Sequence, residues 1–127
     1  MLTNGHKEIK TGYFGQLKRY IEAGYTPVCI ARGKPRWFHG EQLQELAPSR
    51  PLLHAWGNRI TDKNVWRRKF LQELEAVDPK RILRELPDKA VLLCYEKAEE
   101  HDDWCHRHMV AEWFHHKTGI QIDELRL

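Results

Sequence analysis

The sequence predicts a small α/β domain in which a mostly parallel sheet of three to four strands is flanked by helices. Short apolar runs at 26–31 and 90–95, and a weaker one at 120–125, have the lengths and flanking turn or charge signals of buried strands. Amphipathic helical patterns separate these runs. Apolar strands that alternate with helices favour parallel pairing, because the helices cover both faces of the sheet. The 127 residues suit a single Rossmann-like domain over 1–127.

The remaining elements are predicted from local patterns. A strand at 8–11 is too short for its pattern alone to predict it. A first helix ends at Gly24, a second begins at Thr61 or Asp62 as its N-cap, and a third ends at Gly119. Their apolar stripes are Phe14, Leu17, Tyr20 and Ile21; Trp66, Phe70, Leu74 and Val77; and Cys105, Met109, Val110, Trp113 and Phe114.

The composition indicates a soluble cytoplasmic protein. Hydrophobic residues make up 41% and charged residues 31% of the chain. No apolar run approaches the roughly 20 residues of a membrane span, and residues 1–6 lack the apolar segment of a signal peptide. Cys29 and Cys94 lie inside apolar runs, which favours reduced thiols over disulfides. The net charge of +3 permits a nucleotide or nucleic-acid partner without requiring one, no membrane partner is expected, and the oligomeric state stays open.

The central apolar run ends in chemically active side chains. Cys94 closes the run and Glu96 follows it, while Cys105, His106 and Arg107 open the third helix. Ligands of open parallel sheets bind outside the carboxyl ends of the strands. We therefore expect the functional site at this edge of the sheet.

The other predicted strands deliver polar residues to the same edge. Thr11 and Tyr13 lie at the end of the first strand, and Arg32 follows the second. The loop after the second strand is basic and aromatic, so that Lys34 and Trp37 are expected to bind phosphate and stack on a base. The alternative is a surface loop whose aromatic rings cap the core.

These motifs resemble a bacterial and phage family known only as domain of unknown function 488. The resemblance is carried by the segment 11–14, the segment 30–35, the strand 92–96 (LLCYE) and the triplet 105–107 (CHR), and it covers nearly the whole chain. It implies the same fold and site and supports a first strand near 8–11, but it implies no settled activity. The acidic segment 99–103 looks longer than in typical members, which would alter access to the site.

Two chemistries involve the cysteines and histidines. Cys105 at a helix N-terminus, beside His106 and Arg107, fits an activated thiol; alternatively, Cys105 packs in the core on the apolar stripe. Five of the eight histidines fall in 101–116, which permits zinc. However, no C-x-x-C or H-E-x-x-H spacing is present, and the histidines at 115–116 lie roughly 15 Å from Cys105 along a helix.

The third chemistry is phosphate or nucleotide binding. A helix N-terminus binds anions, and Arg32 and Arg107 supply bidentate contacts, so that their alanine variants are expected to lose affinity without unfolding. Glu96 then serves as general base or binds a ribose hydroxyl; alternatively, it pairs with Arg107 or Lys97.

The expected function is that of an enzyme acting on a nucleotide or a nucleic-acid component. The alternatives are a non-catalytic nucleotide or nucleic-acid binding module and a zinc-stabilised interaction protein. No cofactor and no metal ligand is assigned. The expected catalytic residues are Glu96, Cys105 and His106, and the expected ligand-binding residues are Thr11, Tyr13, Arg32, Lys34, Trp37, Cys94 and Arg107.

Overall fold

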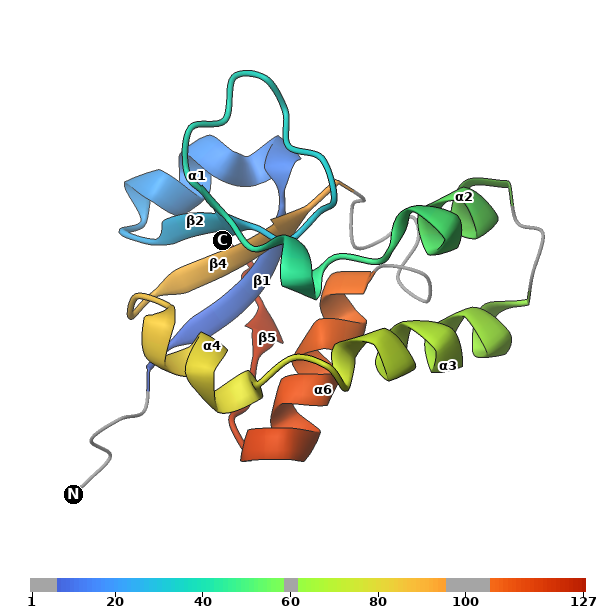
Figure 1. Cartoon of the computed structure of the whole chain (residues 1–127). Coiled ribbons are helices and arrows are strands. Elements are labelled where there is room, and N and C mark those ends of the chain that lie inside the picture. Colours follow the sequence, from blue (N-terminus) through green and yellow to red (C-terminus); the bar gives the residue numbers. More distant parts are fainter. Residues whose placement is uncertain (1–6, 59–61, 96–105) are drawn as a thin grey trace.

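A parallel five-stranded sheet forms the centre of the protein, as seen in the computed structural model in Figure 1. The structure describes residues 7–58, 62–95 and 106–127. The spatial order of the strands is β3-β2-β4-β1-β5, which confirms the predicted α/β class. The strands are β1 (Ile9–Tyr13), β2 (Thr26–Cys29), β3 (Glu41–Gln42), β4 (Ala90–Cys94) and β5 (Asp123–Glu124). The edge strand β3 was not predicted, because two polar residues form no apolar run.

The strand register brings the predicted strand ends together. Tyr13 at the end of β1 lies opposite Cys94 at the end of β4. On the other side of β4, Cys29 of β2 lies opposite Leu93. Because all of these strands are parallel, their carboxyl ends form one edge of the sheet, as the sequence predicts.

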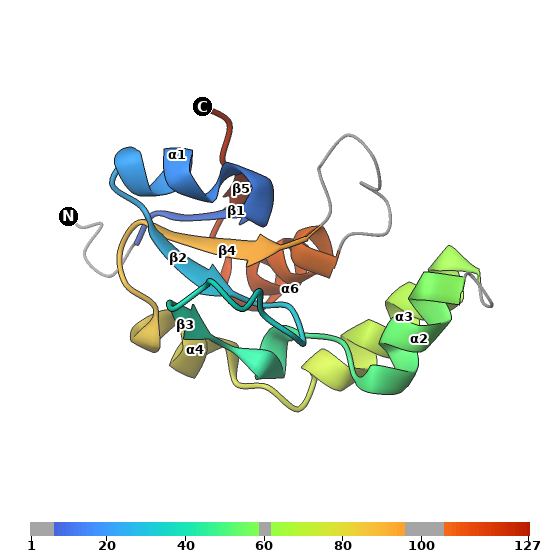
Figure 2. The ribbon, with the colours of Figure 1, turned by 90° about the horizontal axis from the view of Figure 1, so that it is seen from above.

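Helices cover both faces of the sheet (Figures 1 and 2). The short helix α1 (Leu17–Glu22), preceded by a 3₁₀ turn (Phe14–Gln16), lies on one face. On the other side are α3 (Lys63–Leu74), α4 (Pro79–Glu85) and α6 (His106–Thr118), together with α2 (Arg50–Asn58), which packs on α3. In the described segments, no helix has the length and apolar character needed to span a membrane.

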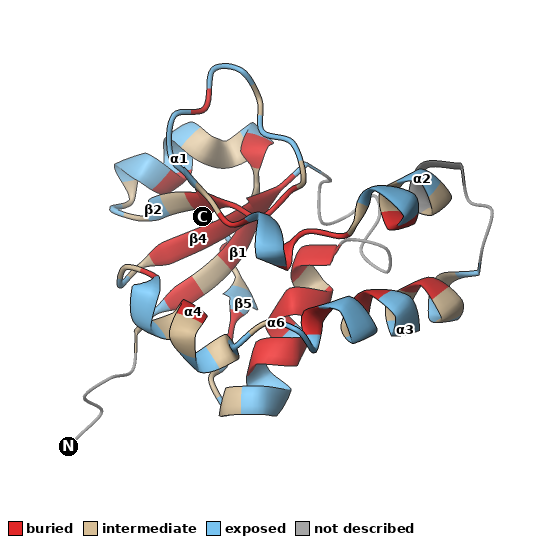
Figure 3. Ribbon diagram, viewed as in Figure 1, coloured by how far each residue is buried: buried red, intermediate tan, exposed pale blue. Residues whose placement is uncertain are grey.

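The central strand β4 explains why its sequence is apolar throughout. All five of its residues are buried, in a layer visible in Figure 3. Ala90, Leu92 and Cys94 face the core beneath α3, α4 and α6, whereas Val91 and Leu93 face the smaller core beneath α1. A strand covered on both faces has no polar side, so its residues do not alternate between apolar and polar.

Several predicted helix details are confirmed. The Asp62 carboxylate accepts a hydrogen bond of 3.0 Å from the Val65 amide and caps α3. Gly24 and Gly119 follow α1 and α6 with φ angles of 91° and 82°, the left-handed conformation that glycine adopts most readily after a helix. Thr61, the other predicted cap, lies outside the described residues.

Other helix predictions were wrong or incomplete. Ile21 was assigned to a buried stripe, but its side chain is 51% exposed. The assumed helix period fails there because Phe14 lies in a 3₁₀ turn before α1 begins. The helices α2 and α4 were not predicted. The α4 sequence does carry a start signal, with Asp78 as N-cap and Pro79 at the first helical position.

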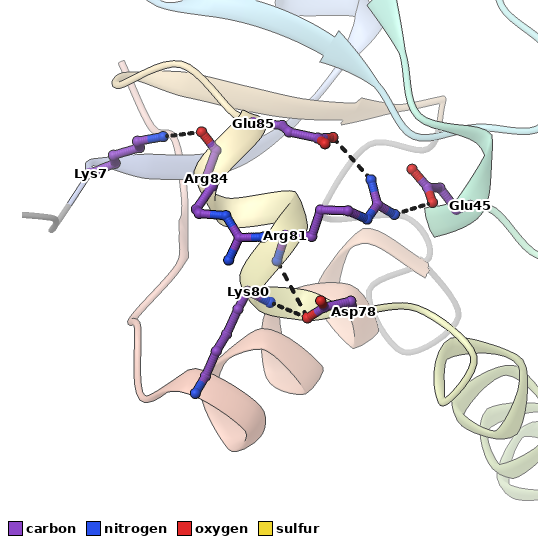
Figure 4. Close-up of polar contacts among 7 residues, drawn as sticks. All are labelled: Lys7, Glu45, Asp78, Lys80, Arg81, Arg84 and Glu85. Carbon is purple, nitrogen blue, oxygen red and sulfur yellow. Dashed lines mark hydrogen bonds and ion pairs between the residues drawn. The ribbon is translucent and has the colours of Figure 1, made fainter.

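Polar contacts fix α4 at both ends (Figure 4). Asp78 accepts hydrogen bonds from two main-chain amides of the first turn. The Lys7 ammonium donates to three carbonyls at the end of the helix, at 2.6, 2.8 and 2.9 Å. Arg81 bridges Glu45 at 2.6 Å and Glu85 at 3.0 Å. These contacts anchor α4 at the end of the sheet opposite to the strand carboxyl ends (Figure 1).

Candidate functional site

A buried ion pair lies at the carboxyl edge of the sheet. Arg107 in the first turn of α6 has a fully buried side chain, and the side chain of Glu124 on β5 is 7% exposed. The guanidinium Nε and Nη2 donate to the two carboxylate oxygens, each at 3.0 Å. Removing two charges from water costs several kcal/mol per ion, so such a pair contributes little net stability. A role in function explains a buried ion pair at this position better than a role in stability does.

Among the described residues, Thr11, Cys94 and Tyr13 also contact this ion pair. The Thr11 hydroxyl donates to Glu124 Oε1 at 2.6 Å, and Arg107 Nη1 donates to Cys94 Sγ at 3.0 Å. The Tyr13 ring lies 5.8 Å from the guanidinium carbon. We call Thr11, Tyr13, Cys94, Arg107 and Glu124 the ion-pair cluster. It is assembled from β1, β4, β5 and α6.

The Glu124 carboxylate is held in its charged form. Burial by itself raises the pKa of this carboxyl group, because the charged form loses its hydration. The hydrogen bonds from Arg107 and Thr11 outweigh this effect, so the pKa of Glu124 lies below its ordinary value. The cluster therefore contains a permanent carboxylate–guanidinium pair at neutral pH.

A cavity of about 150 Å³ adjoins the cluster between β5 and α1. Its polar lining combines the buried carboxylate of Glu124 with the exposed guanidinium groups of Arg19 and Arg126 and the hydroxyls of Tyr13 and Tyr20. This combination can accept hydrogen bonds at one point and bind an anion at another.

Gly12 allows Tyr20 to pack against β1 at the side of this cavity. A Cβ atom at Gly12 would lie 2.6 Å from the Tyr20 hydroxyl oxygen. That hydroxyl accepts a hydrogen bond of 3.3 Å from the Tyr13 amide. Burial raises the pKa of Tyr20, so the group stays protonated and remains a hydrogen-bond donor.

His106 ties the start of α6 to the end of β2. Its Nε2 lies 2.8 Å from the Ile30 carbonyl oxygen, and because a carbonyl only accepts, Nε2 carries the proton. Burial lowers the pKa of His106 to about 4. The hydrogen bond to Ile30 raises the pKa in part, and the positive charge of Arg107 lowers it further. The imidazole is therefore neutral near pH 7.

We expect His106 to make folding stability depend on pH between 6.5 and 4. In this window the unfolded chain protonates His106 and the folded chain does not, so the unfolding free energy falls as the pH falls. The full effect is about 3 kcal/mol, at roughly 1.4 kcal/mol per pKa unit. Urea unfolding at pH 6.5, 5.5 and 4.5 measures it.

Two variants separate this effect from the titration of carboxyl groups. His106→Gln removes the titrating ring, and its stability should change less with pH than that of the wild type. His116→Gln is the matched control, because His116 is exposed near the end of the same helix. Identical pH profiles for His106→Gln and the wild type would contradict the expectation.

The structure brings together four of the residues predicted for the site and separates others from them. Thr11, Tyr13, Cys94 and Arg107 meet in the ion-pair cluster. Arg32 points elsewhere, since its guanidinium donates to the carbonyls of Pro48 at 3.1 Å and Ala47 at 3.2 Å. These bonds hold the segment before α2 against the end of β2.

The other predicted site residues lie apart from the cluster or beyond the described chain. Lys34 and Trp37 are exposed on the loop after β2. Glu96 and Cys105 lie outside the described residues, so the general-base and activated-thiol hypotheses stay predictions. In segments 7–58, 62–95 and 106–127, no three His, Cys, Asp or Glu residues are placed to hold a metal ion together.

Sequence reasoning missed Glu124 and Tyr20. Glu124 lies in the weak apolar run at 120–125, whose acidic residues were assigned no role. A carboxylate in a strand expected to be buried requires a cationic or hydrogen-bonding partner. That rule was the available signal for Glu124. Tyr20 was assigned only to a core stripe, and nothing in the sequence indicates that its hydroxyl reaches β1.

A family model described as the Active DUF488-N3 subclade matches residues 16–118. No curated protein and no solved structure matches the chain. The matched segment contains Cys94 and Arg107, while Thr11 and Glu124 lie outside it.

Proposed function

We propose an enzymatic function for this chain, which belongs to the DUF488 family. The enzyme acts on a nucleotide or a nucleic-acid component at the carboxyl edge of the sheet. The observation that carries the proposal is the buried Arg107–Glu124 pair beside a cavity. The description of the matching subclade as active supports an enzyme over a binding module.

The cavity lining supports a nucleotide as the class of substrate. Sugar hydroxyls and base amino groups donate hydrogen bonds, which the Glu124 carboxylate accepts. Phosphate oxygens carry negative charge, which suits Arg19 and Arg126 at the exposed part of the same cavity. A nucleotide presents both kinds of group within a single small molecule.

The residues of the ion-pair cluster then have distinct roles. Arg107 is fully buried and bound to Glu124, so it holds the carboxylate in place instead of binding substrate directly. Thr11 fixes the same carboxylate from β1. Glu124 lines the cavity and is the group we expect to touch the substrate. Cys94 is oriented by Arg107 from the other side.

Turnover of nucleosides, mononucleotides and short oligonucleotides, followed by mass spectrometry of the products, tests the proposal. We expect Glu124→Gln to lower the rate by about 100-fold or more, the contribution typical of a positioned catalytic carboxylate. Glu112→Gln is the matched control, because Glu112 lies on the surface in an exposed pair with Arg67 and should leave the rate unchanged.

A second variant keeps the test valid if Glu124→Gln loses stability. Arg19 is exposed and lines the cavity, so Arg19→Ala should fold normally and raise the KM for a phosphorylated substrate. Full turnover by Glu124→Gln would contradict the assigned site. Nucleotide binding without any turnover by the wild type would favour the alternative of a non-catalytic binding module.

A further inference from the structure

Two exposed aromatic rings pack against the same buried ring at the carboxyl edge of the sheet. The side chains of Trp37 and Tyr95 are 58% and 51% exposed. Both contact the buried ring of Phe14, at centroid distances of 5.9 Å and 5.1 Å. We call Trp37 and Tyr95 the aromatic surface. Large apolar rings in water are unfavourable, so two of them sharing one neighbour indicate a binding surface.

Contacts with the loop after β2 hold both rings of the aromatic surface in place. The Tyr95 hydroxyl donates to the Gly33 carbonyl at 2.8 Å. Phe38, 3% exposed, anchors the loop by packing against Phe14 at 5.3 Å. The Trp37 ring meets the Phe14 ring edge-on, at 90°. Rings fixed in this way lose little freedom when a ligand stacks on them.

Positive charge accompanies the two rings. Lys34 and Arg36 belong to the same loop and are exposed. Within the part of the chain that the structure describes, neither side chain has a hydrogen bond or an ion pair of its own. Cations without an internal partner, beside exposed aromatic rings, match a ligand that carries both phosphates and flat bases.

The aromatic surface adjoins the ion-pair cluster through the chain itself. Phe14 follows Tyr13 at the end of β1, and Tyr95 follows Cys94 at the end of β4. A ligand stacked on the two rings therefore lies at the same edge of the sheet as the cluster.

We propose that this surface binds single-stranded nucleic acid. Unpaired bases stack on Trp37 and Tyr95, and Lys34 and Arg36 contact the phosphates. A duplex is a poor ligand because its bases are already stacked on each other. The inference rests on the proposed function, because it specifies the form of the proposed substrate. That substrate is a nucleotide within a single strand and not a free mononucleotide.

Fluorescence anisotropy of a labelled oligothymidylate of about twelve nucleotides, within the usual range of site sizes, measures the interaction. At low salt we expect the wild-type chain to bind this strand more tightly than a duplex of equal length or thymidine monophosphate. Trp37→Ala should weaken binding about tenfold, the loss expected for one stacked base. Trp37→Phe should restore part of it, because a smaller ring still stacks.

Charge variants and surface controls complete the experiment. Lys34→Ala combined with Arg36→Ala should weaken binding and make it less sensitive to salt, because fewer counterions are released. Ile21→Ala removes an exposed apolar side chain at the far end of α1. Lys80→Ala removes an exposed cation on α4. The Lys80 side chain points away from the other residues drawn in Figure 4. Both controls should bind like the wild type.

The outcomes separate this inference from the proposed function. Oligothymidylate binding by a wild-type chain that shows no turnover would contradict the proposed enzyme and leave this inference standing. Equal binding by Trp37→Ala and the wild type, or preference for the duplex, overturns the inference while leaving the catalytic proposal standing. The inference is also overturned if the wild type binds no oligonucleotide but self-associates, and if Trp37→Ala abolishes the self-association. A second copy of the chain would then cover the surface.

Discussion

Arg107→Ala should lower the unfolding free energy by about 3–5 kcal/mol, the typical cost of removing one partner from a buried ion pair. The variant leaves the Glu124 carboxylate at 7% exposure without its counter-charge. It also removes the hydrogen bond to Cys94 Sγ. The sequence alone gives a different expectation, in which Arg107 is a bidentate contact to phosphate whose loss leaves the fold intact.

Urea unfolding of five variants tests the effect of the pair: Arg107→Ala, Arg107→Met, Glu124→Gln, the last two changes combined, and the control Arg67→Ala. Glu124→Gln with Arg107→Met replaces both charges, so the double variant should be less destabilised than the sum of its two single changes. Arg67→Ala is the matched control, because its pair with Glu112 is 32% and 62% exposed and should contribute about 0–1 kcal/mol. Equal stability of Arg107→Ala and Arg67→Ala would contradict a structural role for the buried pair.

The same pair should make stability fall in acid. The pKa of Glu124 lies below its ordinary value in the folded chain, so the unfolded chain binds the proton first as the pH decreases. The stabilisation is present above the ordinary carboxyl pKa and is lost as the pH falls through the lowered value. Glu124→Gln should remove this part of the acid sensitivity.

Trp113→Ala is expected to cost about 3–5 kcal/mol, because it opens a cavity in the core beneath α6. Trp113 is 3% exposed, and its ring lies 4.9 Å from that of Phe114. Its Nε1 is buried and has no hydrogen-bond partner within the described residues, so the substitution also removes an unsatisfied donor. We therefore expect a value near the lower end of the range.

His116→Ala is the matched control for this variant. His116 lies three residues further along α6 and is exposed, and both variants introduce alanine into the same helix. Its effect should stay within about 0.5 kcal/mol. Thermal unfolding of both proteins at pH 7 compares them directly. Equal midpoints would show that the buried face of α6 has been assigned incorrectly.

Part of the candidate site could be predicted because it depends on local patterns. Strands with apolar runs and helices with apolar stripes follow from the sequence period, and parallel pairing fixes which strand ends share an edge. That reasoning placed Thr11, Tyr13 and Cys94 together, and the start of α6 brought Arg107 to them. The loop after β2 has no period, so the direction of the Arg32 side chain could not be predicted.

The sequence by itself determined the fold class, the central buried strand and the edge of the sheet at which the candidate site lies, because each depends on residues close together along the chain. Tertiary structure alone decided that Glu124 is the carboxylate partner of Arg107 and Thr11. Thr11 and Glu124 are 113 residues apart, and β5 has only two residues, so no local pattern connects them. Their contact arises because β5 packs beside β1 with Thr11 opposite Glu124. The register of the sheet sets this pairing, and the composition of either segment does not predict it.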